Sequence, residues 1–228
     1  MQKLSLTIRQ VFKEYKHLLL FLYFPVYLVW FAYVEKTVTT NFHVIYMKID
    51  DYIPFCEIFI VPYLLWFAYI GVVVVYIAFA NKTDFKKMCM VLYTGMTIFL
   101  IVSTLYPNGH LLRPTSFERD NIFTQLCSLL YETDTATNIF PSIHVYNSVA
   151  AHFAIIYNEK LGKRKGICIA SGILMVSIVL STVLLKQHSV FDIITALILV
   201  FVMQQLVYVR PWERISRTAP QKVSSSNI

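Results

Sequence analysis

Charged residues are scarce in this sequence, and their scarcity excludes a water-soluble fold. Asp, Glu, Lys and Arg make up 14% of the 228 residues, whereas hydrophobic residues make up 57%. Soluble proteins average about 25% charged residues, so a chain this poor in charge cannot cover a surface that faces water. We therefore expect lipid to surround most of the chain. At about 20 residues per spanning helix, the length allows roughly five to seven spans and no large extramembrane domain.

Cysteine is also scarce, and its spacing excludes the common zinc motifs. The four cysteines are Cys56, Cys89, Cys127 and Cys168, and they form no Cys-x-x-Cys pair. Free cysteine prefers apolar surroundings, so we expect small apolar side chains within helices. A bridge between Cys56 and Cys127 on the outer side stays open as an alternative.

Six apolar stretches are long enough to cross a bilayer. They cover roughly residues 17–34, 56–80, 88–106, 140–158, 167–185 and 190–209. The first is too long for a signal-peptide core and no cleavage site follows it, so we expect a retained anchor. The fourth is the least apolar, because serine, asparagine and histidine interrupt it. The predicted fold is all-α, a polytopic membrane bundle of six transmembrane helices.

The basic residues divide unevenly between alternate loops. Five of the 20 Lys and Arg residues lie in the first, third and fifth loops, and the other 15 lie in the second and fourth loops and near the two ends. The net charge of +7 is therefore better explained by membrane topology than by nucleic-acid binding. Both termini are predicted to be cytoplasmic. We expect a basic segment over 1–16, the membrane domain over 17–209, and a disordered cytoplasmic tail over 210–228.

The third loop contains an amphipathic stretch. In residues 117–131, apolar side chains recur at helical spacing, which predicts a short helix on the outer membrane interface. Such a helix serves either as a packing element or as a lid over a substrate.

Ionisable groups at membrane depth indicate where chemistry takes place, because a charge at a helix centre costs about 2.5 to 3.5 kcal/mol. His144 lies one turn into the fourth stretch, after Pro141 and Ser142, where Ser142 can cap the helix. His188 and Asp192 have the i, i+4 spacing that places both on one helix face. With Arg113 in the third loop, these groups are predicted to share the outer face. Two imidazoles, a carboxylate and a guanidinium form a set suited to phosphoryl transfer.

Three motifs carry a family resemblance. Pro141-Ser142-Ile143-His144 resembles a Pro-Ser-Gly-His motif, and Ser181-Thr182-x5-His188-x3-Asp192 resembles a Ser-Arg-x5-His-x3-Asp motif. Leu112-Arg113-Pro114 resembles the end of a Lys-x6-Arg-Pro motif. In their order and separation over residues 106–192, these motifs resemble the type 2 phosphatidic acid phosphatase (PAP2) superfamily, six-helix membrane proteins with an outer-face site.

The resemblance implies a role for each motif residue. His188 would be the nucleophile that forms a phosphohistidine, Asp192 would orient it, and His144 would protonate the leaving alcohol. Arg113 and Ser142 would bind the phosphoryl oxygens. No metal or other cofactor, no nucleic acid and no obligate protein partner is implied. The expected substrate is a lipid phosphate, phosphatidic acid-like or polyprenyl, reached from the extracytoplasmic side of what we expect to be a bacterial cell membrane.

The departures from the motifs concern the phosphate-binding cations. Tyr106 stands where the first motif has Lys, Thr182 where the third has Arg, and Ile143 where the second has Gly. Lys186 could supply one of the missing charges. A site with fewer cations predicts either a weaker phosphatase or a different acceptor. Sphingomyelin and inositol phosphorylceramide synthases, which move phospho-headgroups between lipids, resemble this sequence in lacking some of those cations.

Other interpretations of the same residues stay open. His144, His188 and Asp192 could form a two-histidine, one-carboxylate metal site, or the protein could be a non-catalytic scaffold with degenerate motifs. Deeper in the fourth stretch, His152 is expected to make an interhelical hydrogen bond. The remaining histidines, His17, His43 and His110, are expected at the membrane interface, and residues 50–55 in an outer aromatic belt.

Overall fold

The computed structural model describes residue 10 and residues 13–209. The predicted tail 210–228 and most of the predicted basic segment 1–16 lie outside these residues. Within them the chain forms helices α2 Tyr23–Thr37, α3 Ile60–Ala80, α4 Lys82–Leu105, α5 Ile122–Thr133, α6 Ile143–Tyr157, α7 Lys165–Leu184 and α8 Val190–Gln204. Two short strands, β1 His43–Val44 and β2 Asn108–Gly109, pair in parallel.

Five helical segments are long and apolar enough to cross a membrane. They are Lys13–Thr37, Glu57–Ala80, Lys82–Leu105, Lys165–Leu184 and Val190–Val209, so a segment can extend beyond the α-helix it contains. Many of their large apolar side chains are exposed along the outside of the bundle, as expected for a surface that faces lipid. The prediction of a mostly helical protein is thereby confirmed, and these five helices are consistent with a multi-pass membrane protein. The count of six spans and the side on which the termini lie stay predictions.

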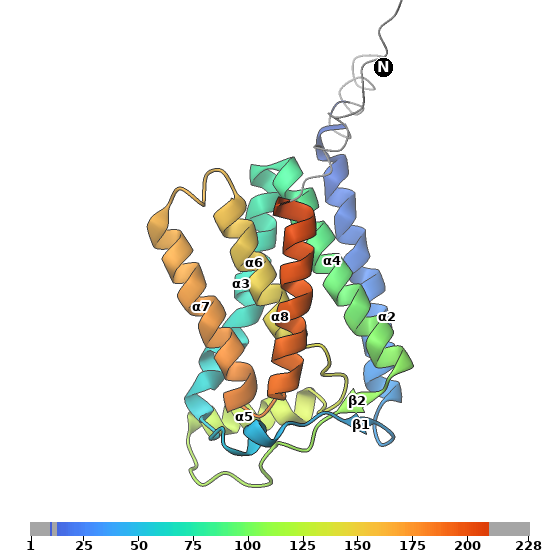
Figure 1. Ribbon diagram of the computed structural model, residues 1–228, viewed down its shortest axis with the longest axis vertical. Coiled ribbons are helices and arrows are strands. Elements are labelled where there is room, and N and C mark those ends of the chain that lie inside the picture. The colour runs from blue at the N-terminus through green and yellow to red at the C-terminus, as the bar shows by residue number, and fades with distance from the viewer. Residues whose placement is uncertain (1–9, 11–12, 210–228) are drawn as a thin grey trace, which may run out of the picture.

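The predicted fourth span is the element that differs. Helix α6 covers 15 residues, a length of about 22 Å against a hydrocarbon core of about 30 Å. It is short because Ser142 caps its beginning and the chain leaves the helix at Asn158. Helix α6 runs through the middle of the bundle and packs against α3, α4, α7 and α8 (Figure 1). Protein rather than lipid therefore surrounds most of this helix.

One close approach brings α4 against α6. The ring of Tyr146 on α6 lies against the α carbon of Gly95 on α4, in space that any β carbon there would fill. The Tyr146 hydroxyl donates a hydrogen bond to the carbonyl oxygen of Val91 at 2.7 Å. The pair fixes the depth at which α6 sits, because the tyrosine both fills the gap and satisfies its own hydroxyl.

A polar cluster joins α3, α6 and α7 inside the bundle. The Ser171 hydroxyl lies 2.7 Å from the Tyr69 hydroxyl and 2.9 Å from His152 Nδ1. The predicted interhelical hydrogen bond of His152 is thus confirmed. Such bonds satisfy polar groups that lipid cannot satisfy.

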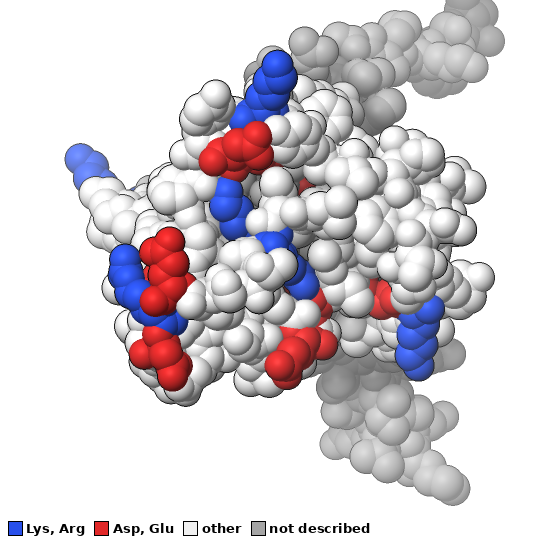
Figure 2. Space-filling view, turned by 90° about the horizontal axis from the view of Figure 1, so that it is seen from below, with Lys and Arg blue, Asp and Glu red and all other residues white. Residues whose placement is uncertain are grey.

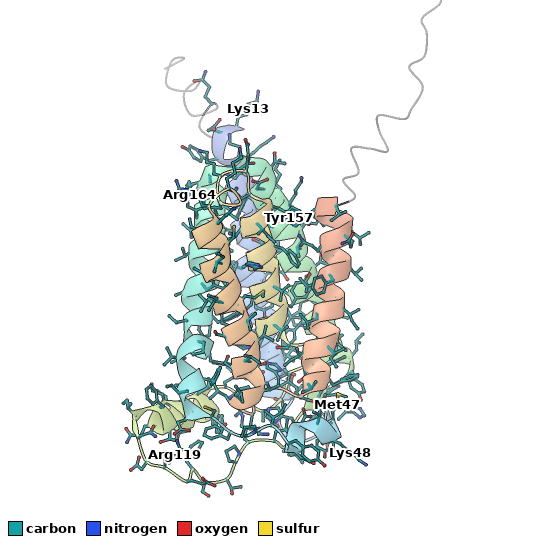
Figure 3. All side chains as sticks on the ribbon, turned by 60° about the vertical axis from the view of Figure 1, so that its left-hand side comes forward. Lys13, Met47, Lys48, Arg119, Tyr157 and Arg164 are labelled. Carbon is teal, nitrogen blue, oxygen red and sulfur yellow. The ribbon has the colours of Figure 1, made fainter. Side chains whose placement is uncertain are left out.

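The first, third and fifth loops meet at one end of the bundle, which we call the loop end. Figure 3 shows Met47, Lys48 and Arg119 at this end and Lys13, Tyr157 and Arg164 at the opposite end. Helix α5 lies across the loop end (Figure 1), so the amphipathic stretch of the third loop does form a helix. Its buried Cys127 packs in a small core with residues of α3 and the fifth loop. All four cysteines are free thiols, so the Cys56–Cys127 bridge is not formed.

Candidate active site

The site begins with an imidazole and a carboxylate at the start of α8. His188 Nδ1 lies 3.3 Å from Asp192 Oδ2, and both side chains are buried. Ser189 caps the helix and its backbone N–H donates to the same carboxylate oxygen at 2.9 Å. Because a carboxylate accepts, the neutral ring carries its proton on Nδ1. That tautomer leaves the lone pair of His188 on the other ring nitrogen, Nε2.

A second imidazole faces the first from α6. The ring centroids of His144 and His188 are 5.7 Å apart. His144 also lies against Tyr63 and Trp66 of α3, at 4.6 and 4.4 Å between ring centroids. Helix α6 and the start of α8 thus bring together His144, His188 and Asp192, and α3 packs against His144. The aromatic walls hold the His144 ring in place, and its Nδ1 is buried without a partner in the described part of the chain.

Ser142 lies directly beside this pair. Its hydroxyl oxygen accepts from the Val145 backbone N–H at 3.4 Å, which confirms the expected cap of α6. Its own backbone N–H points to the Asp192 carbonyl oxygen at 3.4 Å. The side chain is fully buried. Ser142 therefore joins the start of α6 to the start of α8, the two places from which the imidazoles project.

The turn between α7 and α8 sets the position of His188. Lys186 adopts a left-handed backbone with φ of 52°, which only a few per cent of non-glycine residues do. The turn lets the backbone N–H groups of Gln187 and His188 both donate to the Thr182 carbonyl oxygen, at 2.9 and 3.0 Å. The last turn of α7 thus satisfies its orphan carbonyl while it directs His188 back into the bundle.

The guanidinium of Arg113 is held mainly by the third loop. It donates to the carbonyl oxygens of Tyr131, Asp134 and Thr135 at 2.8 to 3.2 Å, and to Gln187 Oε1 at 2.6 Å. It also lies 4.6 Å above the Tyr131 ring. Arg113 therefore ties the end of α5 to the residue before His188. Its Nε is buried and unpaired among the described residues.

The ammonium group of Lys186 is also engaged. Its Nζ donates to the backbone carbonyl oxygen of Asp50 at 2.7 Å. Lys186 thus lies near the site, but its charge is directed toward the first loop. Four of the six residues proposed from the sequence lie together in the structure: His144, His188, Asp192 and Ser142. The charged groups of the other two, Arg113 and Lys186, contact oxygen atoms of the loops instead.

Asp50 is a buried residue that the sequence reading placed in an aromatic belt. Its Oδ2 accepts from the Ser189 hydroxyl at 2.6 Å and from the Met47 N–H at 2.7 Å. Its Oδ1 accepts from the Val190 N–H at 2.9 Å. The carboxylate therefore caps α8 from outside the helix. No local pattern indicates this role, because the partners lie about 140 residues away in the chain.

Removing this carboxylate is expected to loosen the site. In Asp50→Ala the Ser189, Met47 and Val190 donors lose their buried acceptor, and we expect the free energy of unfolding to fall by about 2 to 4 kcal/mol. Thermal unfolding in detergent micelles measures the loss. Asp51→Ala, at an exposed neighbouring carboxylate, is the matched control and should change stability by less than about 0.5 kcal/mol. Equal effects of the two substitutions would contradict the capping role.

Asn108 fastens the third loop to the start of α6. Its side-chain oxygen accepts from the Ile139 and Phe140 backbone N–H groups, both at 2.9 Å. The neighbouring His110 is 1% exposed, so protein encloses its ring, and its position at the membrane interface stays a prediction. His17 is buried as well and bonds to the Ala78 carbonyl oxygen at 2.9 Å. His43, by contrast, is partly exposed at the loop end and stacks on Tyr106.

A comparison with protein families supports the resemblance that the three motifs indicate. A model of the PAP2 superfamily matches residues 111–216. No curated protein and no solved structure matches the chain. Similarity to the PAP2 superfamily over these residues suggests a phosphatase or phosphotransferase that acts on lipid phosphates.

Two cation positions of the PAP2 motifs are structural here. Tyr106 is exposed, and its ring stacks on His43 with 4.2 Å between centroids. Thr182 is fully buried, and its hydroxyl donates to the Val179 carbonyl oxygen within α7. Neither side chain makes a hydrogen bond to the imidazole pair. Within the described residues no group of three His, Cys, Asp or Glu side chains is arranged to hold a metal ion.

Burial favours the neutral form of two imidazoles, His110 in the third loop and His188 in the fifth loop. Burial and then the charges of His188 and Arg113 lower the pKa of His110 to about 3, although the Gln187 backbone and Asp50 act in the opposite direction. Burial and the Arg113 charge likewise lower the pKa of His188 to about 3. A neutral imidazole is the form in which His188 can act as a nucleophile.

The lowered pKa of His110 predicts a loss of stability in acid. Between pH 6.5 and 3 the unfolded chain binds a proton that the folded chain does not bind, so stability falls as the pH falls through this window. The loss attributable to His110 approaches about 1.4 kcal/mol per pH unit. Thermal unfolding at pH 7.5, 6 and 5 measures it. His110→Asn should make the dependence shallower, with the share due to His188 remaining, whereas His43→Asn should leave it as in the wild type; identical slopes in all three proteins contradict the assignment.

Proposed function

We propose that this protein is an integral membrane enzyme that hydrolyses a lipid phosphate ester through a phosphohistidine on His188. The observation that supports the proposal is the paired arrangement of His188 on Asp192 at 3.3 Å with His144 facing it at 5.7 Å. A nucleophile, a group that orients it and an acid within one substrate's reach form a recognisable set for displacement. The PAP2 superfamily match is consistent with that chemistry.

The first displacement forms a bond between His188 Nε2 and phosphorus. The bond from phosphorus to the ester oxygen breaks, and a proton from His144 goes to the departing lipid alcohol. Asp192 accepts the Nδ1 proton of His188 in a hydrogen bond, which stabilises the positive charge that develops on the ring. A negative phosphoryl group beside His144 favours the imidazolium form that can donate this proton.

The second displacement releases phosphate. Water attacks phosphorus, His144 takes the water proton, and the nitrogen–phosphorus bond breaks. In this scheme Arg113 and Ser142 bind phosphoryl oxygens, and Lys186 adds charge nearby once its contact with the first loop opens. Preorganised donors of this kind stabilise charge that develops on phosphoryl oxygens in the transition state.

The proposal includes a membrane orientation. With α6 as a sixth, protein-surrounded span, both termini lie on the side that carries most of the basic residues, which is the cytoplasm. The loop end then faces the extracytoplasmic side, and a lipid of the outer leaflet reaches His144 and His188 with its headgroup. The expected setting is a bacterial cell membrane, and the mechanism uses no metal and no obligate protein partner.

Transfer of a phospho-headgroup to a lipid alcohol is the second candidate. The observation that favours it is that both candidate cations are engaged, Arg113 by loop carbonyl oxygens and Lys186 by the Asp50 carbonyl oxygen. A site whose charges are already satisfied binds a dianion less firmly. Transfer uses the same phosphohistidine and replaces water by an alcohol in the second displacement.

One screen separates these functions. The full-length purified protein in mixed micelles is supplied with phosphatidic acid, polyprenyl phosphate or a phosphodiester lipid, with metal ions and with EDTA. We expect phosphate release that EDTA leaves unchanged. A labelled lipid product in the presence of diacylglycerol or ceramide would indicate transfer. Activity that disappears in EDTA and returns with a metal ion would support the two-histidine metal site, and absence of any turnover would support a scaffold.

A further inference from the structure

Two buried neutral donors beside His188 have no partner. His110 and Gln187 are 1% and 2% exposed. Among the residues that the structure describes, Gln187 Nε2 makes no hydrogen bond, and His110 Nε2 makes none of good geometry, although the His110 ring lies near the Gln187 backbone. A buried N–H group without an acceptor costs about 1 to 3 kcal/mol in general. Both donors are therefore placed where a ligand oxygen can satisfy them.

The hydrogen bonds of both side chains identify these atoms as donors. His110 Nδ1 accepts the Leu112 backbone N–H at 3.1 Å, so the neutral ring carries its proton on Nε2. Gln187 Oε1 accepts from Arg113 at 2.6 Å, which leaves the amide nitrogen as the free end. Each side chain thus has one end anchored to the third loop and the other end unpaired.

The two donors adjoin the reacting imidazole. Gln187 immediately precedes His188, and the backbone N–H groups of both donate to the Thr182 carbonyl oxygen. His110 lies close enough to His188 and to the Gln187 backbone for both to shift its pKa. The unpaired Nε of Arg113 belongs to the same group. One cation and two neutral donors therefore belong to the loops next to the proposed nucleophile.

The charge of the loop end is negative overall. Its Lys and Arg residues are Lys36, Lys48, Arg113, Arg119 and Lys186. Its Asp and Glu residues are Glu35, Asp50, Asp51, Glu57, Glu118, Asp120, Glu132, Asp134 and Asp192. Figure 2 shows these two kinds of side chain interspersed over this end of the molecule. Among so many acidic residues, a phosphate with two negative charges would keep one charge without a positive partner. A phosphate with one negative charge can be neutralised by Arg113 alone.

We propose that His110 Nε2 and Gln187 Nε2 bind phosphoryl oxygens in place of the missing motif cations, so that the site takes a singly charged phosphate, a lipid phosphodiester. The inference rests on the proposed function for its location and changes the substrate class of that site to diesters, for which the second displacement releases a phosphomonoester in place of inorganic phosphate. Neutral donors hold an oxygen by hydrogen bonds without adding charge, which favours a monoanion over a dianion.

Matched substitutions remove one donor at a time. Gln187→Glu keeps an oxygen for Arg113 and replaces the free N–H group by a second oxygen. His110→Asn keeps an acceptor near the position of Nδ1 and removes the donor at Nε2. His43→Asn and Gln125→Glu are the controls, because both side chains are at the loop end and outside the site. Circular dichroism and gel filtration in detergent establish that each variant is folded.

Binding is measured without turnover in a His188→Ala background. Dioctanoyl phosphatidylglycerol and dioctanoyl phosphatidylethanolamine serve as phosphodiesters and dioctanoyl phosphatidic acid as the monoester, with tryptophan fluorescence as the readout, since Trp66 contacts His144. We expect both diesters to bind more tightly than the monoester. Each donor substitution should weaken diester binding roughly tenfold or more, and the controls should not change it.

The outcomes separate this inference from the proposed function. Tighter binding of the monoester, or diester binding that is unchanged in both His110→Asn and Gln187→Glu, overturns the inference. If diester binding is unchanged in both variants, but the wild type turns over a lipid phosphate and His188→Ala does not, the proposed function still holds. Diester binding that depends on both donors, with no turnover of any lipid phosphate by the wild type, supports the inference and contradicts the proposed function.

Discussion

His188→Ala is expected to reduce lipid phosphate turnover by at least about a thousandfold, because it removes the atom that bonds to phosphorus. The His188 ring also fills buried space next to Asp192, so the variant must be shown to fold. The measurement is phosphate release from mixed micelles, combined with an SDS quench at alkaline pH that traps the 32P-labelled protein. The wild type should show an acid-labile, base-stable phosphohistidine, and the variant should show none.

His43→Ala is the control for this experiment. His43 is a histidine of the same end, but its ring stacks on Tyr106 and not on the imidazole pair. Its removal should leave both turnover and labelling at the wild-type level. If His188→Ala keeps full activity, or if its labelling equals that of the wild type, His188 is not the nucleophile.

His144→Ala is expected to reduce turnover by about 10² to 10⁴, the usual contribution of a positioned general acid or base. The loss should depend on the leaving group. A lipid alkoxide needs the proton that His144 supplies, whereas a nitrophenolate departs without one. With a nitrophenyl phosphate ester in place of the lipid, the first displacement should therefore lose far less, and burst kinetics measure that step separately from the release of phosphate.

A purely structural role for His144 predicts a different pattern. Its ring lies against Tyr63 and Trp66, so a packing defect would slow the nitrophenyl and lipid substrates by the same factor. It would also lower the thermal unfolding temperature together with activity. His144→Gln, which retains a polar side chain of similar reach, separates the two cases: it should recover stability but not the rate with the lipid ester.

Local patterns predicted much of the fold. The apolar stretches predicted five spans that the structure contains, and the periodicity of residues 117–131 predicted α5, which the structure begins at Ile122. Ser142 and Ser189 stand before their helices with the residue types that cap helix starts. The central helix α6 was predicted as an ordinary span and is short and surrounded by protein. Its small and polar residues were visible in the sequence, but their partners were not.

For the candidate site, too, local sequence patterns predicted some features and missed others. The i, i+4 spacing of His188 and Asp192 determined that they share a helix face, because helix geometry requires nothing beyond the local chain. The Lys and Arg count assigned His144 and Arg113 to the same end, and the motif resemblance named their roles. The sequence also pointed to Arg113 and Lys186 as free cations. The structure has their charges on loop oxygens.

By itself, the sequence determined a helical bundle with several helices long and apolar enough to span a membrane, and it predicted that the candidate site residues lie at one end. Periodicity, capping residues and charge asymmetry are local properties, and each can be read within a few helical turns. The tertiary structure decided which groups touch. The bonds of Asp50 to the start of α8 and of Gln187 to Arg113 are contacts between loops far apart in the chain. They depend on how the helices pack, and no local pattern encodes the distance between two loop residues.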